Sequence, residues 1–239
     1  MFNAELAGHS FTIDDHYKEA RHYFQDYITS QPGSPLTVSE AEIDALQKFK
    51  PYLSRGFLET RLLNRKIAQL LVDKDVLLFH ASAVMLDGKA YIFTAPSGTG
   101  KSTHRSLWQA HFGSRLTVIN DDNPFLHITP IQVTAYGSIF GGKDNLQTNT
   151  SAEVAGIAIL QQAQLNSIRL LPPKDAYPLL FRQVYRAVGQ EKMIKVLNLV
   201  SYLCNIPIYQ LSCNISDEAV DLCYRTLSTK KGRKFCNEA

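Results

Sequence analysis

The chain has 239 residues, of which 45% are hydrophobic and 20% charged, a composition typical of a globular protein of one or two domains. No apolar run reaches the roughly 18 residues that a membrane-spanning helix needs, and the first residues lack the basic-then-apolar pattern of a signal peptide. The cysteines number only four, and none is spaced as a metal-binding pair, which indicates reduced thiols. We therefore expect a cytoplasmic protein that does not associate with membranes.

The formal net charge of +3 is confined to the last ten residues. Residues 230–239 contain four basic residues and one acidic residue, so the preceding 229 residues are neutral overall. A protein that binds nucleic acid presents a basic face on its folded part. We therefore expect no nucleic-acid partner, and we interpret residues 230–239 as a basic, disordered tail.

Residues 1–75 predict a small accessory region of mixed α and β structure. The turn-rich segment 30–35 separates its two short strands. Ser39 followed by Glu42 is a capping-box signal that starts a helix. The expected elements are strands at residues 10–13 and 36–38 and helices at residues 39–50 and 57–72.

Residues 76–229 predict the core of the protein, in which strands alternate with helices. Apolar runs lie on either side of Asp87-Gly88, the dipeptide of a tight hairpin turn, and predict two antiparallel strands. Ser216 or Asp217 is expected to cap the last helix. The expected elements are strands at residues 76–86, 89–95, 116–120, 125–128, 132–136, 154–160 and 206–213 and helices at residues 100–112, 174–186, 191–203 and 217–227.

A glycine-rich segment, A-P-S-G-T-G-K-S at residues 95–102, matches the phosphate-loop pattern G-x-x-x-x-G-K-[ST] except that Ala95 replaces the first glycine. In such a loop, backbone N–H groups surround phosphate oxygens, the lysine reaches the β- and γ-phosphates, and the serine hydroxyl binds Mg²⁺. Ala95 is compatible with this role if its φ stays negative. The alternative is a glycine-rich turn that ends in Lys-Ser by chance. The residues expected to contact a nucleotide are Pro96, Ser97, Gly98, Thr99, Gly100, Lys101, Ser102 and Thr103.

Two acidic residues, Asp121 and Asp122, follow an apolar strand after the loop. A strand end can fix a carboxylate beside the metal of a phosphate loop, and consecutive residues of an extended chain point in different directions. One carboxylate can therefore face the metal while the other faces an acceptor hydroxyl. A surface turn before Pro124 is the alternative. His80 lies in the strand before the hairpin, where it either packs in the core or orients one of these carboxylates.

The order of these motifs is unusual, because an antiparallel hairpin leads into the loop. The combination of H-x-S-A-V at residues 80–84, A-P-S-G-T-G-K-S-T at 95–103 and N-D-D at 120–122 resembles HPr kinase/phosphorylase and the phosphoenolpyruvate-carboxykinase-like nucleotide-binding proteins. More closely, it resembles the small HPr-kinase-like proteins of bacteria, some of them found beside genes for ribosomally made peptides. The resemblance covers about residues 76–225. It implies an α/β fold with a mixed sheet, a hairpin before the P-loop, flanking helices and a small N-terminal α+β addition.

Members of this family use ATP and Mg²⁺ to phosphorylate a serine hydroxyl, and the resemblance implies roles for matching residues. Asp121 is then the catalytic base toward the acceptor, with His80 as its partner. Asp122 and Ser102 are the implied metal ligands. Lys101 is implied to hold the phosphates.

Two further cations match the family pattern more loosely. Lys143 and Arg186 are implied to contact phosphate or acceptor, although a surface ion pair explains either residue equally well. The chain also departs from the pattern, because Asn123 stands where a lysine is usual and residues 138–140 replace Thr-Pro-Trp. These departures affect the expected acceptor pocket and not the nucleotide loop.

We therefore expect an ATP- and Mg²⁺-dependent kinase that transfers the γ-phosphoryl group to a hydroxyl, the hydroxyl of a serine in a peptide or protein or that of a small molecule. Residues 1–75 are expected to recognise the acceptor or a leader peptide, and HPr itself is not the expected acceptor because these residues do not resemble the N-terminal domain of the HPr enzyme. One alternative is a non-catalytic ATP-binding accessory protein in peptide maturation. Another is a structural module that binds no nucleotide. The related enzymes are oligomeric, so the resemblance is compatible with a homo-oligomer.

Overall fold

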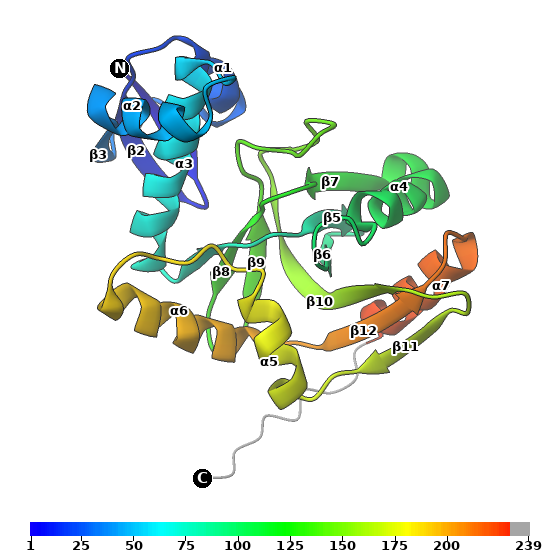
Figure 1. Cartoon of the computed structure of the whole chain (residues 1–239). Helices are drawn as coiled ribbons and strands as arrows, with labels where there is room; N and C mark the ends of the chain where they lie inside the picture. The colour runs from blue at the N-terminus through cyan, green and yellow to red at the C-terminus, as the bar shows by residue number, and fades with distance from the viewer. Residues whose placement is uncertain (230–239) are drawn as a thin grey trace.

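The computed structural model describes residues 1–229, in which helix α3 connects a small N-terminal sheet to a larger mixed sheet (Figure 1). The expected basic tail at residues 230–239 lies outside the described residues. In the N-terminal part, β1 pairs antiparallel with β2, and β2 pairs parallel with β3. Its elements are β1 (Phe2–Leu6), β2 (His9–Asp14), α1 (Glu19–Phe24), the 3₁₀ helix η1 (Gln25–Tyr27), β3 (Ser34–Thr37), α2 (Glu40–Phe49) and α3 (Arg55–Val72).

The capping box predicted for α2 is present. The backbone N–H of Glu42 donates to the Ser39 hydroxyl, and the backbone N–H of Ser39 donates to the Glu42 carboxylate. These two bonds satisfy donors that the first turn of a helix otherwise leaves without a partner. The start of α2 is therefore set by local sequence, as expected.

Within residues 76–229, nine strands form one mixed sheet in the order β4-β8-β9-β10-β6-β5-β7, with β12 beside β10 and β11 beside β12. The mixed α/β architecture agrees with the expected fold class. The elements are β4 (Val76–Leu78), β5 (Ser82–Leu86), β6 (Lys89–Thr94), α4 (Lys101–Phe112), the 3₁₀ helix η2 (Gly113–Arg115), β7 (Leu116–Asn120), β8 (Phe125–Ile128), β9 (Val133–Tyr136), β10 (Ser151–Gln162), β11 (Ser167–Leu170), α5 (Pro173–Phe181), α6 (Gln190–Leu203), β12 (Ile208–Cys213) and α7 (Asp217–Ser228).

The hairpin before the glycine-rich loop is present, with β5 antiparallel to β6. Asp87 and Gly88 turn between them with positive φ values of 51° and 75°, the conformation that a tight hairpin turn requires. On its other side β6 pairs parallel with β10. The strand that leads into the loop is therefore central in the sheet and held on both edges.

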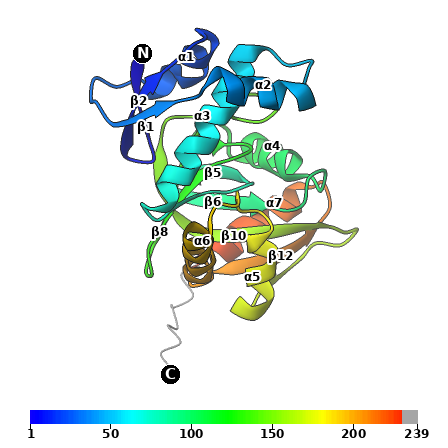
Figure 2. The same ribbon diagram turned by 60° about the vertical axis from the view of Figure 1, so that its left-hand side comes forward.

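Helices cover both faces of the large sheet (Figure 2). Side chains of α5 and α6 pack on one face in a core that includes Phe79, Ile92 and Leu199, and α4 and α7 pack on the other around Trp108. A third core lies between the N-terminal sheet and α3, and it continues into Val76, Leu78, Phe125 and Ile139 of the large sheet region. Helix α3 therefore has a fixed position against the end of the large sheet.

Two expected elements differ from the structure for the same physical reason. The strand predicted at residues 76–86 is broken at residues 79–81, and the helix predicted at residues 174–186 ends at Phe181. The residues after α5 instead pair with the break, because the His80 N–H donates to the Gln183 carbonyl and the Tyr185 N–H donates to the Leu78 carbonyl. β11, which was not predicted, is a largely exposed edge strand that pairs with β12.

Candidate active site

The glycine-rich loop connects β6 to α4 as expected from its sequence. Gly98 and Gly100 have φ values of 82° and 111°, a region that only glycine adopts without strain. Ala95 does not adopt a positive φ, so its replacement of glycine leaves the backbone unstrained. The Pro96 carbonyl accepts hydrogen bonds from the backbone N–H and the hydroxyl of Thr99, which closes the loop.

Lys101, the first residue of α4, turns its side chain back toward the loop. Its amine donates to the Ala95 carbonyl at 3.0 Å, and the residue is only 9% exposed. Burial lowers the pKa of Lys101, while Asp122 and Asp121 favour the charged form. This amine has one hydrogen-bond partner among the described residues, so two of its three donors remain for an anionic ligand. Ser102 and Thr103 follow in the first turn of α4 and are exposed.

The turn after β7 is organised by Asn120, a buried residue of the N-D-D motif whose role in the turn was not predicted from the sequence. Its side-chain oxygen accepts from the backbone N–H groups of Asp122 at 2.9 Å and Asn123 at 2.7 Å. Its amide nitrogen donates to the Phe140 carbonyl at 3.0 Å. Asn at a strand end is a common turn-forming residue, so this signal was available in the sequence. Asn120 thereby fixes the acid pair relative to the loop at residues 137–146.

Asp121 is buried and engaged on both carboxylate oxygens. Oδ1 accepts from the Ser82 hydroxyl at 2.6 Å, and Oδ2 pairs with the Arg105 guanidinium at 3.0 Å. Arg105 is itself buried and also contacts Asp144 at 3.1 Å. Neither Ser82 nor Arg105 was identified from the sequence, although Arg105 lies four residues after Lys101 and so on the same face of α4. Asp121 therefore belongs to a buried ion pair.

Asp122 is the carboxylate beside the histidine. The distance between His80 Nε2 and Asp122 Oδ1 is 3.8 Å, and His80 Nδ1 is 3.1 Å from the Gln183 side-chain oxygen. The expected pairing of His80 with Asp121 is thus replaced by a pairing with Asp122. The cause is the break at residues 79–81, where the Ala81 N–H donates to the Asp122 carbonyl. Burial raises the pKa of Asp122, and the positive charges of His80 and Lys101 partly oppose this.

The loop that carries Lys143 approaches the acid pair closely. Gly142 has a φ of 75°, and a Cβ at this position would lie 3.2 Å from the Asp121 carbonyl oxygen. Glycine is required here by both conformation and space. Lys143 is consequently placed in the same cavity as Asp122. Arg186 is not, because its exposed guanidinium lies 5.5 Å from the centre of the Phe181 ring.

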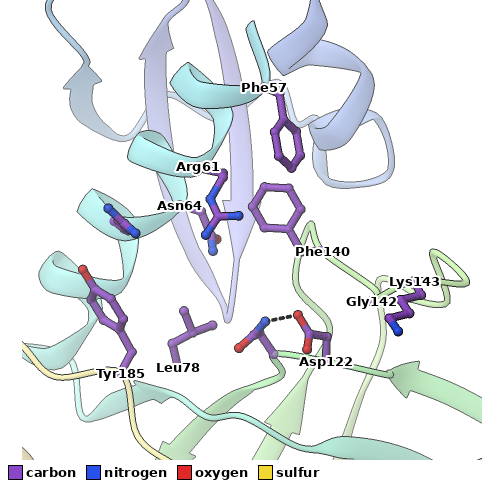
Figure 3. Close-up of a pocket in the computed structure, with 11 residues that line it drawn as sticks. Phe57, Arg61, Asn64, Leu78, Asp122, Phe140, Gly142, Lys143 and Tyr185 are labelled. Atoms are coloured by element: carbon purple, nitrogen blue, oxygen red, sulfur yellow. Dashed lines mark hydrogen bonds between the residues drawn. The ribbon is translucent and has the colours of Figure 1, made fainter. Parts of the chain in front are cut away.

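Two cavities adjoin these residues. The first, which we call the α3 cavity, has a volume of about 460 Å³ and lies between α3 and the end of β7; Figure 3 shows Arg61 and Asn64 on α3 across from Asp122 and Lys143. The second, the loop cavity, has a volume of about 520 Å³ and is lined by residues 98–100 of the glycine-rich loop together with apolar side chains. Those apolar residues are Leu107, Leu160 and Ile215.

Comparison with known proteins identifies similarity to a solved structure but no matching family model. No protein-family model matches the chain, and no curated protein matches it. Among solved structures, the chain is similar to the HPr(Ser) kinase/phosphatase from Coxiella burnetii, with 12% sequence identity and a TM-score of 0.37 over 62% of this chain and 88% of that chain. Among the described residues, no helix is both long enough and apolar enough to cross a membrane.

Proposed function

We propose that this protein is an ATP- and Mg²⁺-dependent phosphotransferase that transfers the γ-phosphoryl group to a hydroxyl. One observation carries the proposal: the buried Lys101 amine follows a glycine-rich loop and lies in the field of the Asp122 carboxylate, which lines a separate cavity. A cationic donor beside a phosphate loop suits phosphoryl transfer, in which positioning and charge neutralisation supply most of the rate. The sequence resemblance to HPr kinases agrees with this reaction class.

In this proposal the nucleotide occupies the loop cavity. Leu107, Leu160 and Ile215 provide apolar surface for the adenosine, and the loop N–H groups and Lys101 bind the phosphates. The start of α4 directs the positive end of the helix dipole at the same phosphates. The loop cavity thus brings apolar side chains and residues 98–100 of the glycine-rich loop to one site.

The residues present also fit a magnesium ion that arrives with the nucleotide. Among residues 1–229, no group of three or more His, Cys, Asp or Glu side chains is arranged so that it could hold a metal ion by itself. Mg²⁺ keeps several waters and needs only one or two protein ligands in addition to phosphates. Ser102 would ligate the ion directly, and Asp122 would hold one of its waters. When bound, the ion neutralises charge that develops on the phosphates.

The geometry changes the proposed base from Asp121 to Asp122. Both oxygens of Asp121 are occupied by Ser82 and Arg105. Asp122 accepts on Oδ2 from the Asn123 side-chain amide, but its side chain is 38% exposed and lines the α3 cavity. Burial raises the pKa of Asp122, which brings it closer to the pKa that suits a general base. In this proposal Asp122 accepts the proton of the acceptor hydroxyl, and His80 orients the Asp122 carboxylate.

The test measures nucleotide binding and transfer separately. ATP with Mg²⁺ at one hundred times its Kd should stabilise the wild-type protein by about 2.7 kcal/mol. Lys101→Ala should lose this stabilisation, whereas Lys174→Ala, which changes an exposed lysine away from both cavities, should keep it. Transfer of label from γ-labelled ATP to acceptors in a cell extract should disappear in Asp122→Asn. ATP-dependent stabilisation of Lys101→Ala equal to that of the wild type would refute the phosphate-loop assignment.

A second function, a non-catalytic ATP-binding accessory protein, is favoured by two observations. Asp121 is held in a buried ion pair, and Asn123 lines the α3 cavity at the position where related sequences carry a lysine. Calorimetry distinguishes the two functions. Tight binding of ATP and Mg²⁺ without turnover across a broad set of hydroxyl acceptors would support the accessory role and contradict the kinase.

A further inference from the structure

The α3 cavity carries a charge pattern that nucleotide binding does not explain. Arg61, Arg65 and Lys143 line it, against a single carboxylate, that of Asp122. None of these three cations forms an ion pair within residues 1–229, although Arg61 contributes to the electrostatic field at Asp122. Two of the three cations, Arg61 and Arg65, lie on helix α3, outside the large sheet that carries the glycine-rich loop. The residues that line the cavity therefore carry a net positive charge.

A buried polar atom in the same cavity lacks a partner. Asn64 is 6% exposed and lines the α3 cavity, and its Oδ1 atom has no hydrogen-bond partner. Native structures rarely leave a buried acceptor unsatisfied, and such an atom calls for an explanation, for example a water, an ion or a functional role. Oδ1 can only accept, so the group that completes it must present an O–H or N–H. Figure 3 shows Asn64 on α3, one turn from Arg61 and next to it in the cavity.

The remaining wall and the volume restrict the size of the ligand. Phe57 and Phe140 lie with ring centres 5.9 Å apart on one side, and Leu78 and Tyr185 provide further wall. A volume of about 460 Å³ lies within the range of small-molecule sites. A cavity of this size can hold a small molecule whole, and we take the ligand to belong to that class.

We propose that the α3 cavity binds the phosphoryl acceptor, and that this acceptor is a small acid that carries both a hydroxyl and a carboxylate or phosphate group. Arg61, Arg65 and Lys143 bind the acidic group, and Asn64 accepts from an O–H or N–H of the molecule. This inference rests on the proposed kinase function.

The reaction balances with the groups already named. The acceptor oxygen forms a bond to the γ-phosphorus, and its proton passes to Asp122. The bond between the γ-phosphorus and the β–γ bridging oxygen breaks, and its electron pair leaves with ADP. No oxidant, reductant or further co-reactant is needed.

The first experiment measures binding without nucleotide, so that it does not depend on transfer. Calorimetry with the full chain uses glycerate, glycerol 3-phosphate and inorganic phosphate as probes, and glycerol as the uncharged control. At least one acid should bind at least about tenfold more tightly than glycerol, because charge-assisted hydrogen bonds are the strong ones. Failure of every acid to exceed glycerol would overturn the inference.

Variants locate the binding. Arg61→Gln and Arg65→Gln should each weaken acid binding by about tenfold or more, whereas Arg182→Gln, which changes an exposed arginine outside the cavity, should leave it unchanged. Asn64→Leu is the sharpest variant, because it removes an unsatisfied buried oxygen while keeping the size of the side chain. It should weaken binding without lowering Tm. Wild-type affinity in all three cavity variants would place the acid elsewhere and overturn the inference.

The second experiment measures transfer of label from γ-labelled ATP. Transfer to glycerate, with a raised KM for glycerate and an unchanged KM for ATP in Arg65→Gln, supports the inference. Transfer only to a serine peptide blocked at both ends, with wild-type KM in Arg65→Gln, would overturn it and leave the kinase function intact. Acid binding that is lost in Arg65→Gln, with no transfer to any acceptor, would overturn the kinase function and leave an anion-binding cavity.

Discussion

Changing each of the two acids after β7 to asparagine should have different effects, one on stability and the other on activity. Asp121→Asn removes the charge from an ion pair whose side chains are 2% and 4% exposed. Breaking a buried pair costs about 3–5 kcal/mol. We expect about 3 kcal/mol, because Asp144 still contacts Arg105 and the new side chain can still accept from Ser82. In a chain of this length that loss corresponds to a fall in Tm of about 6–12 °C.

Asp122→Asn should change activity and not stability. The Asp122 side chain is 38% exposed, and the nearest cationic group in an ion pair is His80 at 3.8 Å. Pairs this exposed contribute no more than about 1 kcal/mol to folding. Loss of a positioned general base lowers a rate by about 10²–10⁴. The same one-atom change at neighbouring residues therefore separates a structural carboxylate from a catalytic one.

Both variants can be examined with two measurements on the same preparations, thermal unfolding without ligand and transfer of label from γ-labelled ATP to the acceptor that the wild type uses. We expect a large fall in Tm for Asp121→Asn and a small fall in Tm for Asp122→Asn. Label transfer by Asp122→Asn at the wild-type rate would refute the base assignment. An unchanged Tm for Asp121→Asn would refute the buried ion pair.

Three further predictions test the local structure. Gly142→Ala forces a Cβ to 3.2 Å from the Asp121 carbonyl at a φ of 75°, so it should destabilise the fold by more than about 1 kcal/mol and slow transfer while ATP-dependent stabilisation persists; full transfer activity would contradict this. The buried His104 accepts from the Trp108 indole N–H, and burial lowers its pKa to about 4, so the unfolded chain binds the proton more readily. The free energy of unfolding should therefore fall by up to about 3 kcal/mol as the pH drops from 6.5 toward 4, because the unfolded chain takes up a proton at His104 and the folded chain does not. Urea unfolding of His104→Gln should show a smaller loss over the same pH range. Ser39→Ala should cost about 0.5–2 kcal/mol in the same assay, and no change would show that the capping box contributes nothing.

Local chemistry accounts for the parts of the fold that could be predicted. The hairpin at Asp87-Gly88 follows from residues that tolerate positive φ, and the start of α2 follows from Ser39 and Glu42. The loop before Lys101 also depends on local glycines. Each of these features is set within about six residues of chain, so a single sequence contains the information.

The partners within the site depend on distant segments and could not be read in this way. The break at residues 79–81 is held by backbone bonds to Pro124, Asp122 and Gln183, which are 40 or more residues away. No local pattern distinguishes such a break from a continuous apolar strand. It decides that His80 lies beside Asp122 and not Asp121. The acid pair and the histidine were named from the sequence, and the structure places His80 beside Asp122, whereas the expected partner was Asp121.

The α3 cavity is lined by residues from two separate parts of the chain. Asp122 lies in the turn after β7, while Arg61, Asn64 and Arg65 lie on a single helix that precedes the large sheet in the sequence. Substitutions along one face of that helix can alter which molecule enters the cavity without moving β7 or the glycine-rich loop. If the cavity binds the acceptor as proposed, mutation at these three neighbouring positions would change the choice of acceptor while the glycine-rich loop stays the same. The same arrangement offers a short, contiguous target for redesign of specificity.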